Sequence, residues 1–263
     1  MKIIITGSEG FIGTALIKRL RLLAVEVVGC IDSKLGIEVE NMRASQFTHV
    51  DVIIHLAAQT SVFNEDHDLI IRDNIVAFKN IVDVANQLNA KLIYASSSCA
   101  NNITSLYGIS KKFNEEYADI YSNNATGIRF HNVYSGTPRE GTLLYNLITN
   151  SNPVIVNNGD NIRHFTYIDD VVEGIIKAIQ IDEKLVNIRN PIQNTVREYV
   201  EEARKYLDLS GLSYTNSMRE YDKLNQYVDE NIYTIEMDYK PIKEGLRLSL
   251  YKGVNSEETT RGN

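Results

Sequence analysis

The sequence predicts an α/β protein built on a parallel, doubly wound sheet, with a smaller α/β lobe toward the C-terminus. Short runs rich in β-branched residues alternate with longer stretches of helical period from the N-terminus onward. In addition, a glycine-rich turn joins the first predicted strand to the first predicted helix. Strands that alternate with helices are typical of a parallel sheet whose two faces are both covered by helices.

The chain opens with a strand, a helix and a second strand. The first strand is Lys2–Thr6, the second covers residues 25–31, and the helix between them has an apolar face formed by Phe11, Ile12, Leu16 and Leu20. Further strands are predicted at 52–56, 91–96, 126–130, 154–156 and 186–188, and further helices at 69–88, 110–121, 142–149 and 168–179. Residues 33–51 are too few for a helix, a full strand and a second helix. The third strand is therefore expected to be reduced or missing.

The same pattern suggests how the chain divides into domains. We expect residues 1–134 to form the sheet domain, with elements from about 164–190 returning to it. After Tyr134, turn-rich segments separate shorter elements, so residues 135–254 are expected to form mainly the smaller lobe. Residues 255–263 are mostly polar and small, and we expect a flexible tail there.

The composition excludes several classes of protein. The chain of 263 residues carries 27 Lys and Arg against 34 Asp and Glu, which gives a formal net charge of −7, and 43% of its residues are hydrophobic. Because it also lacks a basic run, nucleic acid and anionic membrane surfaces are not expected as partners. No apolar stretch approaches the roughly 20 residues that span a bilayer, so no membrane segment is expected.

The cysteines and histidines predict neither a disulfide framework nor a metal site. Cys30 and Cys99 form no C-x-x-C motif, which is consistent with a reducing cytoplasm, and we expect a cytoplasmic protein. The five histidines include no pair four residues apart and no H-E-x-x-H motif. We therefore expect no bound metal.

The glycine-rich turn has the sequence Thr6-Gly7-Ser8-Glu9-Gly10-Phe11-Ile12-Gly13. Gly7 permits a tight turn, Gly10 lets the backbone approach a pyrophosphate, and Gly13 allows close packing of the helix. The phosphates would lie at the helix N-terminus, where unsatisfied N–H groups favour anions. This interpretation predicts a dinucleotide site of the Rossmann type. The alternative is an ordinary glycine turn.

Asp32 ends the second predicted strand, 19 residues after Gly13. A carboxylate at this position can accept hydrogen bonds from both hydroxyl groups of an adenosine ribose. The same charge would repel a 2′-phosphate, so Asp32 favours NAD over NADP as the cofactor. The nearby Lys34 leaves NADP open as an alternative.

Tyr107 and Lys111 stand four residues apart, which places them one turn apart on one helix face. Tyrosine has an unperturbed pKa of about 10, and a neighbouring ammonium group and a cationic nicotinamide would both favour its phenolate. Ser98 ends a serine run at the carboxyl edge of the sheet, where doubly wound folds bind ligands. Together these three residues predict a catalytic set that moves a proton to and from a substrate oxygen.

In this combination the chain resembles an extended short-chain dehydrogenase/reductase of the NAD-dependent nucleotide-sugar epimerase/dehydratase family. The resemblance runs from Met1 to about Ile179, with a fainter match at 237–250. Besides the motifs above, it rests on His55-Leu56-Ala57-Ala58, on Asn74-Ile75-Val76, and on the segments 128–134 and 158–171.

The resemblance implies a role for particular residues. It implies Ser98, Tyr107 and Lys111 as the catalytic set, and Ser98, Asn132 and Arg163 as contacts to a nucleotide-diphosphate sugar. The implied cofactor is NAD, in contact with Gly7, Gly10, Phe11, Ile12, Gly13, Asp32, Leu56, Ala57, Ala58, Asn74, Ser96, Tyr107 and Lys111. The resemblance also implies a homodimer formed through the helices predicted at 69–88 and 110–121.

The residues after Ser98 bear on the type of reaction. The family's 4,6-dehydratases have an Asp-Glu pair after the catalytic Thr, whereas Cys99 and Ala100 follow Ser98 here, which disfavours dehydration. We therefore expect an epimerase that acts through a transient 4-keto sugar. A nucleotide-sugar reductase or dehydrogenase is an alternative. So is a non-catalytic NAD-binding protein, because the segment 99–106 is shorter than in many relatives.

Overall fold

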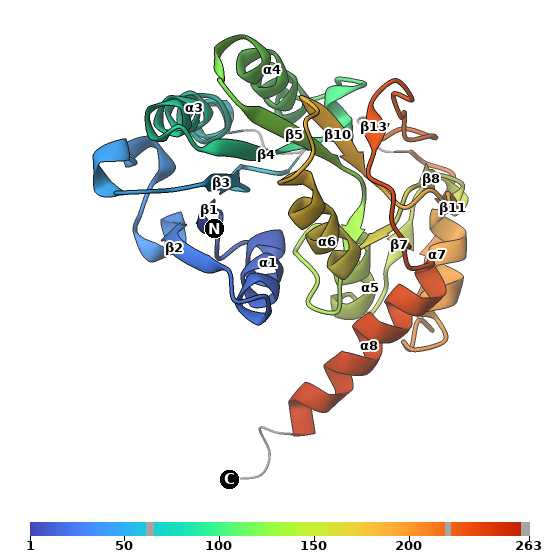
Figure 1. The fold of residues 1–263 in the computed structure, drawn as a ribbon. Coiled ribbons are helices and arrows are strands. Elements are labelled where there is room, and N and C mark those ends of the chain that lie inside the picture. Colours follow the sequence, from blue (N-terminus) through green and yellow to red (C-terminus); the bar gives the residue numbers. More distant parts are fainter. Residues whose placement is uncertain (62–65, 219–221, 259–263) are drawn as a thin grey trace. The chain divides into compact units, whose positions relative to one another are not determined.

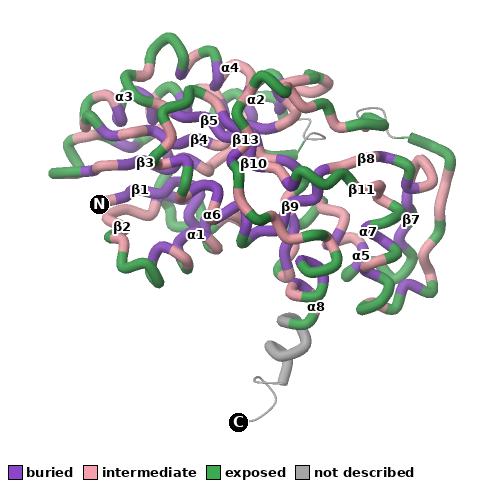
Figure 2. The backbone as a smooth tube through the Cα atoms, turned by 45° about the vertical axis from the view of Figure 1, so that its right-hand side comes forward, coloured by how far each residue is buried: buried purple, intermediate pink, exposed green. Residues whose placement is uncertain are grey.

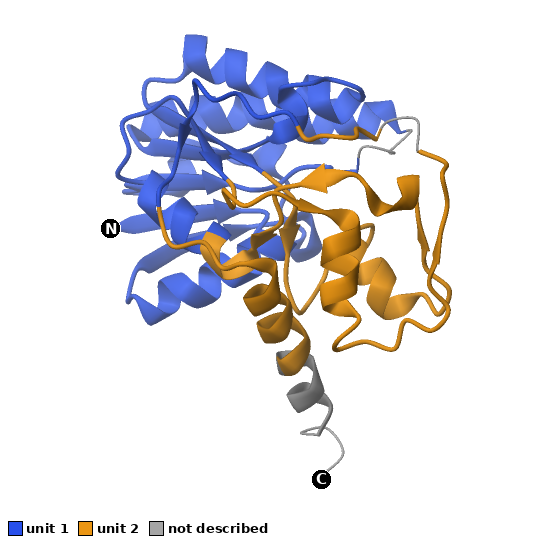
Figure 3. Ribbon diagram, turned by 90° about the vertical axis from the view of Figure 1, so that its right-hand side faces the viewer, with its two compact units in different colours: residues 1–130, 171–188, 227–236 blue, residues 131–170, 189–226, 237–263 orange. Residues whose placement is uncertain are grey.

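The computed structural model describes residues 1–61, 66–218 and 222–258, the last seven of them by their backbone alone. The chain forms two compact units (Figure 3). Unit 1 consists of residues 1–130, 171–188 and 227–236, and unit 2 of residues 131–170, 189–226 and 237–263. From the sequence, we expect a later segment, at about 164–190, to return to the sheet domain. The second returning segment, 227–236, falls in the stretch that we assigned to the smaller lobe.

Unit 1 contains a seven-stranded sheet in the order β13-β10-β5-β4-β3-β1-β2, in which all the paired strands run parallel. This confirms the predicted parallel sheet. Its strands are β1 (Lys2–Thr6), β2 (Glu26–Ile31), β3 (Val52–His55), β4 (Lys91–Ser97), β5 (Ala125–Phe130), β10 (Leu185–Ile188) and β13 (Tyr233–Thr234). The sequence does not predict β13, because two residues are too few to show a pattern. Its pairing with β10 brings residues 227–236 into unit 1.

Helices cover both faces of this sheet, as the alternating pattern predicts (Figure 1). On one face lie α1 (Phe11–Leu22) and α6 (Ile168–Ala178), and on the other lie α3 (Ala77–Leu88) and α4 (Leu106–Tyr121). The helix predicted at 69–88 is divided in the structure. It consists of α2 (His67–Ile70), a π-helical turn over Ile71–Val76, and α3.

Helix α4 begins one turn earlier than the sequence analysis expects. The predicted start at residue 110 is wrong because the Ser105 hydroxyl accepts a hydrogen bond from the Gly108 N–H at 3.2 Å and caps the helix there. Tyr107 therefore lies in the first turn of α4, and its position relative to Lys111 is fixed by helix geometry.

One part of the core of unit 1 lies between the sheet and α3. Phe78, Ile81 and Val82 on the inner face of α3 are fully buried, and the Phe78 ring meets the Tyr94 ring edge-on with 5.0 Å between ring centroids. Burial of one such side chain contributes about 1.5–3 kcal/mol. In Figure 2 the buried residues follow the central strands and the helix faces that lie against them.

No strand occurs among residues 33–51, all of which the structure describes, and the expectation of a reduced or missing third strand is confirmed. Three single-turn 3₁₀ helices occupy this segment, at Ser33–Leu35, Val39–Asn41 and Ala44–Gln46. Two of its carbonyl groups bond to α3, because the Asn80 amide donates hydrogen bonds to the carbonyls of Val39 and Met42 at 2.8 and 3.0 Å. The segment thus covers one edge of the core without adding a strand.

Unit 2 is built from short elements. Its two-stranded pairs are β6 (Val133–Tyr134) with β9 (Thr166–Tyr167), β7 (Val154–Ile155) with β12 (Ser213–Tyr214), and β8 (Ile162–Arg163) with β11 (Asn194–Thr195). Its helices are α5 (Leu143–Thr149), α7 (Val196–Ala203) and α8 (Ile242–Glu258). The strand predicted at 154–156 is therefore present as β7, but it pairs within unit 2.

Aromatic side chains fill the centre of unit 2. The Tyr199 ring is buried, stacks on Phe165 with 4.2 Å between centroids, and meets the Tyr134 ring edge-on at 5.3 Å. Part of the tail expected at 255–263 lies in α8, which continues to Glu258. Residues 259–263 lie outside the described part of the chain.

Candidate cofactor-binding and catalytic site

The candidate site of unit 1 lies at the carboxyl ends of the central strands. Thr6, the last residue of β1, is in register with Ile31 at the end of β2 and with His55 at the end of β3. The chain passes from β1 to β2 on one side and then returns to β3 on the other side. Ligands of doubly wound sheets bind at such a reversal of strand order.

Gly7 is the residue on which the turn after β1 depends. Its φ angle is +70°, and a Cβ atom there would lie 2.6 Å from the backbone nitrogen of Ala57. Its own N–H donates to the Ile31 carbonyl at 2.8 Å. The backbone of residue 7 therefore runs directly against the segment that follows β3, and only glycine fits.

Gly10 and Gly13 bring the start of α1 close to this turn. The Gly10 N–H donates to the Gly7 carbonyl at 3.0 Å, and a Cβ at Gly13 would collide with that same carbonyl oxygen. Gly10 occupies the N-cap of α1, where no side chain caps the helix and no acidic residue occupies the first turn. The uncapped N–H groups and the positive end of the helix dipole suit a pyrophosphate.

Asp32 follows β2 and is held by backbone groups. It is 8% exposed, and its two carboxylate oxygens accept hydrogen bonds from the N–H groups of Glu9 and Lys34, each at 3.0 Å. Because a carboxylate offers about four acceptor positions, two remain for the hydroxyls of a ribose. The Lys34 ammonium donates to the Glu9 carbonyl at 3.1 Å.

Tyr107 and Lys111 lie one turn apart on α4, as predicted, and both are buried. Tyr107 is 9% exposed and Lys111 is 1% exposed, and the Lys111 Nζ lies 5.8 Å from the centroid of the Tyr107 ring. The ammonium donates to the Ala95 carbonyl of β4 at 2.9 Å. Burial lowers the pKa of Lys111 to about 8, against an opposing contribution from Glu115.

His55 is a buried neighbour of the site that the sequence analysis places only within a motif. Its Nδ1 lies 2.7 Å from the Thr6 hydroxyl oxygen, and burial, with a smaller effect of the Lys111 charge, lowers the pKa of His55 to about 3. His55 is therefore a neutral imidazole at physiological pH. It joins the ends of β1 and β3 without adding charge beside Lys111.

Asn74 braces the start of α4. It lies in the π-helical turn, is 1% exposed, and donates from Nδ2 to the Ser110 hydroxyl at 3.0 Å and to the Gln59 carbonyl at 2.9 Å. The Ser110 hydroxyl in turn donates to the Tyr107 carbonyl at 2.8 Å. Both amide hydrogens thus support the turn that carries Tyr107, and the contact of Asn74 to the cofactor stays a prediction.

Ser96 and Ser98 belong to different environments. The Ser96 hydroxyl is buried and donates to Glu115 Oε1 at 2.6 Å, and the contact of Ser96 to the cofactor stays a prediction. Ser98 begins a half-buried 3₁₀ turn over Ser98–Ala100, directly after β4. The two serines share a strand end, and Ser98 is the one predicted to offer its hydroxyl to the substrate.

A buried ion pair lies beside these serines and was missed by the sequence analysis. Glu115 of α4 receives two hydrogen bonds from Arg129 of β5, from Nε to Oε1 and from Nη2 to Oε2, each at 2.7 Å. Both side chains are about 5% exposed. Two features of the sequence could have indicated this ion pair. Glu115 follows Lys111 by four residues, on the same helix face, and Arg129 lies within an apolar strand.

Asn132 and Arg163, the predicted substrate contacts, belong to unit 2. Asn132 is exposed, and its carbonyl accepts from the Thr166 N–H at 3.1 Å. The Arg163 side chain is 12% exposed and forms an ion pair with Asp222. Its Nη1 also donates a hydrogen bond to the carbonyl of the preceding residue, Ile162, at 2.8 Å. The structure thus shows a guanidinium already oriented by a carboxylate.

Residues 1–61, 66–218 and 222–258 contain no group of three or more His, Cys, Asp or Glu side chains that could hold a metal ion. Within the same residues, none of the helices has the length and apolar character that crossing a membrane requires.

The fold and the glycine turn of unit 1 define a nucleotide-binding protein of the doubly wound α/β class. The model of the NAD dependent epimerase/dehydratase family matches residues 3–189, and the chain belongs to this family. Its cofactor is accordingly NAD, which confirms the expectation drawn from Asp32 and from the family resemblance.

Known proteins show how far the similarity extends. Protein CapI of Staphylococcus aureus is 33% identical over 233 residues, which cover 68% of this chain and 70% of CapI. UDP-glucuronate 4-epimerase 3 of Arabidopsis thaliana is 33% identical over 52% of this chain and 38% of its own length. The structure of UDP-glucuronic acid 4-epimerase from Bacillus cereus with UDP-glucuronic acid and NAD has a TM-score of 0.79, covers 98% of this chain and 100% of that one, and is 21% identical. At this identity it shows the shared fold.

Proposed function

We propose that the protein is an NAD-dependent epimerase of a nucleotide-diphosphate sugar and acts through a transient 4-keto sugar. The proposal rests mainly on the buried Lys111 ammonium 5.8 Å from the Tyr107 ring, in the same unit as the glycine turn. The relatives that are UDP-glucuronate 4-epimerases support a sugar carried on a nucleoside diphosphate as the substrate class.

In this proposal the residues at the strand ends hold the cofactor. Gly7, Gly10 and Gly13 hold its pyrophosphate at the start of α1, where Phe11 and Ile12 form the first helical residues. Asp32 accepts the adenosine ribose hydroxyls. Further contacts come from Leu56, Ala57 and Ala58 after β3, from the Ser96 carbonyl, and from Tyr107 and Lys111. Bound NAD supplies reversible hydride acceptance at C4 of the sugar.

The proton is handled by the chain itself. Tyr107, as the phenolate, takes the proton from the sugar 4-hydroxyl and later returns it to the same oxygen. The Ser98 hydroxyl donates a hydrogen bond to that oxygen. The Lys111 ammonium favours the phenolate of Tyr107 because opposite charges in a buried site attract strongly. If the 4-keto sugar rotates in the site before C4 regains its hydride, the hydride arrives on the opposite face and the configuration at C4 is inverted.

We assign the diphosphate of the substrate to Arg163 and Asn132. A guanidinium group binds phosphate oxygens through two parallel N–H donors. Asp222 holds the Arg163 guanidinium in a defined orientation before any ligand arrives. Arg163→Gln is expected to weaken nucleoside diphosphate binding while leaving NAD binding unchanged.

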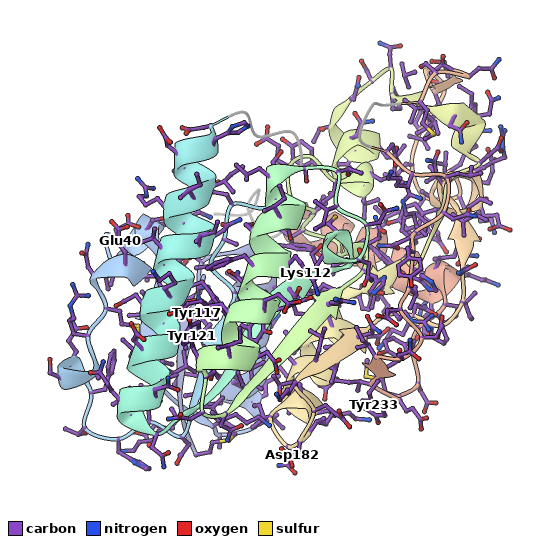
Figure 4. All side chains as sticks on the ribbon, turned by 90° about the horizontal axis from the view of Figure 1, so that it is seen from above. Glu40, Lys112, Tyr117, Tyr121, Asp182 and Tyr233 are labelled. Carbon is purple, nitrogen blue, oxygen red and sulfur yellow. The ribbon has the colours of Figure 1, made fainter. Side chains whose placement is uncertain are left out.

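We further propose a cytoplasmic homodimer. Cys30 and Cys99 form no disulfide bond with each other, as suits a reducing compartment. Near the helices implied in dimerisation, Ile71, Val76, Ile120 and Tyr121 are each at least 42% exposed. Figure 4 shows Tyr121 and Tyr117 on the side of α4 that faces α3. Sedimentation of the wild type against Ile120→Glu tests the dimer, since a charge at a contact would produce monomers.

The activity is tested by incubating the purified protein, without added cofactor, with UDP-, GDP- and dTDP-sugars and analysing products by chromatography and mass. A product of unchanged mass and altered retention supports epimerisation with bound NAD. Turnover that requires added NADH and a keto sugar supports a reductase instead. NAD binding without any conversion supports a non-catalytic NAD-binding protein.

A further inference from the structure

We propose that the Arg129–Glu115 ion pair, together with Asn101, is a clamp that positions Ser98 relative to Tyr107. This inference rests on the proposed function and adds three positioning residues to it. All of these residues belong to unit 1, and none of the three touches the predicted substrate oxygen in the mechanism above. Their role would be to fix the short segment that carries Ser98.

The clamp holds this segment at both ends. At its start, the Ser96 hydroxyl donates to Glu115 Oε1 at 2.6 Å. Beyond Ser98, the Asn101 side-chain oxygen accepts a hydrogen bond from Arg129 Nη1. Arg129 and Glu115 are joined to each other by two hydrogen bonds of 2.7 Å. The two ends of the segment are therefore bound to one and the same ion pair. Ser98 lies between the two anchors.

The ion pair also connects this segment to the helix that carries the predicted base. Glu115 lies on α4, one turn after Lys111 and two turns after Tyr107. A displacement of α4 along its axis would therefore move Glu115 and, through it, the anchors of the Ser98 segment. The distance between Ser98 and Tyr107 is thus set by one network of hydrogen bonds.

Because the network is buried, it is rigid, and loss of one of its members would destabilise the protein. Arg129 and Glu115 are 3% and 6% exposed, and removal of one partner of a buried ion pair leaves an uncompensated charge. The packing between the segment and α4 is equally close, because a Cβ at Gly108 would lie 3.0 Å from the Cys99 carbonyl oxygen. A segment as short as 99–106 has no regular strand of its own to order it. The clamp supplies that order.

Asn101 gives the cleanest test, because changing it leaves the ion pair intact. Asn101→Ala removes the acceptor for Arg129. Asn101→Asp keeps the acceptor oxygen. It replaces only the amide nitrogen Nδ2, which is buried and has no hydrogen-bond partner among the described residues, so no hydrogen bond is lost there. The exposed neighbour Asn102 provides the matched control, Asn102→Ala.

We expect Asn101→Ala to lower kcat for epimerisation by about tenfold or more with little change in KM, as misplacement of a catalytic group does. Asn101→Asp should restore kcat, and Asn102→Ala should leave it unchanged. In a Ser98→Ala background, Asn101→Ala should add little further loss, because the residue acts through Ser98. An equal loss with and without Ser98 would overturn the clamp, as would an unchanged kcat in Asn101→Ala.

Hydrogen exchange of the backbone amides at residues 98–101 provides a readout that does not depend on turnover. Faster exchange in Asn101→Ala, but not in Asn102→Ala or Asn101→Asp, supports the clamp. Equal exchange in all four proteins, the wild type included, contradicts it. If the wild type converts no nucleotide sugar, the proposed function fails, and this exchange measurement still decides whether the segment is clamped.

Discussion

The ammonium nitrogen of Lys111 lies 5.8 Å from the centre of the Tyr107 ring, and both side chains are buried on one face of α4. Water is largely excluded from this pair, so the positive charge acts on the phenol through a medium of low dielectric constant. A nearby ammonium stabilises a phenolate, and this is the role that the proposed mechanism gives Lys111. In that mechanism Tyr107 is the base at the carboxyl edge of the sheet.

Removing the Tyr107 hydroxyl should abolish this base. In Tyr107→Phe we expect epimerisation to fall by about 10²–10⁴-fold, the usual contribution of a positioned general base. NAD binding should persist, because the glycine turn and Asp32 are untouched. Single-turnover assays and titration with NAD measure the two effects. A folded Tyr107→Phe protein with full activity would contradict the assignment.

The lowered pKa of Lys111 predicts how stability changes with pH. Its folded-state pKa, about 8, lies below the ordinary value of 10.5 because burial disfavours the charged form. Between these values the unfolded chain binds more protons than the folded one, so the Lys111 contribution to stability rises with pH from about 8 to 10.5. Below pH 8 the full penalty of burying the charge is present.

This dependence should vanish when the ammonium is removed. We expect the free energy of unfolding of the wild type to increase relative to that of Lys111→Met as the pH rises from 7 to 10. Urea titrations at four pH values measure this difference in the free energy of unfolding. The control is Lys112→Met, which removes a neighbouring lysine whose side chain is 40% exposed. A constant difference between wild type and Lys111→Met would show that Lys111 is not the group responsible.

Gly7 and Gly36 form a matched pair for testing the cofactor turn. Both have left-handed φ angles, +70° and +72°, but a Cβ at Gly36 meets nothing within 4 Å whereas one at Gly7 meets the Ala57 backbone nitrogen at 2.6 Å. Gly36→Ala should cost about 1–2 kcal/mol of stability from backbone strain alone. Gly7→Ala should cost more and should also weaken NAD binding at least about tenfold, or about 1.4 kcal/mol. Equal NAD affinity in the two variants would argue against a cofactor at this turn.

Much of the fold was predictable because its signals are local. Strands β1 and β3 are short apolar runs, and Gly7, Gly13 and Asp32 are fixed by spacing along one βαβ unit. The start of α4 was not predicted correctly, because Ser105 lies in a turn-like sequence and its capping role depends on the helix that follows. β13 is too short to be recognised without its partner β10.

The parts of the site that were missed depend on residues distant in sequence. The Glu115–Arg129 pair joins a helix to the following strand, and the Arg163–Asp222 pair joins residues 59 positions apart. A charge pattern in a single sequence cannot show which carboxylate meets which guanidinium. The hydrogen bonds of Ser96 to Glu115 and of Asn74 to Ser110 are tertiary contacts of the same kind, and the contacts of both residues to the cofactor stay predictions.

Asp32 should determine the choice between NAD and NADP. Two unit charges 4 Å apart interact by about 1–4 kcal/mol, depending on the surrounding dielectric constant, so a carboxylate beside the ribose opposes a 2′-phosphate. Asp32→Asn keeps an oxygen for the N–H groups of Glu9 or Lys34 but removes the charge. We expect the ratio of NADP to NAD affinity to rise at least about tenfold.

Lys34 provides the complementary test, because its ammonium is held at the Glu9 carbonyl, next to the residue whose N–H binds Asp32. If Lys34 attracts the 2′-phosphate, Asp32→Asn combined with Lys34→Met should lose the NADP binding that Asp32→Asn gains. Calorimetric titration of both cofactors against the three proteins measures this. An unchanged NADP to NAD ratio in Asp32→Asn would show that the carboxylate at the end of β2 serves only to cap its own turn and to hold Glu9.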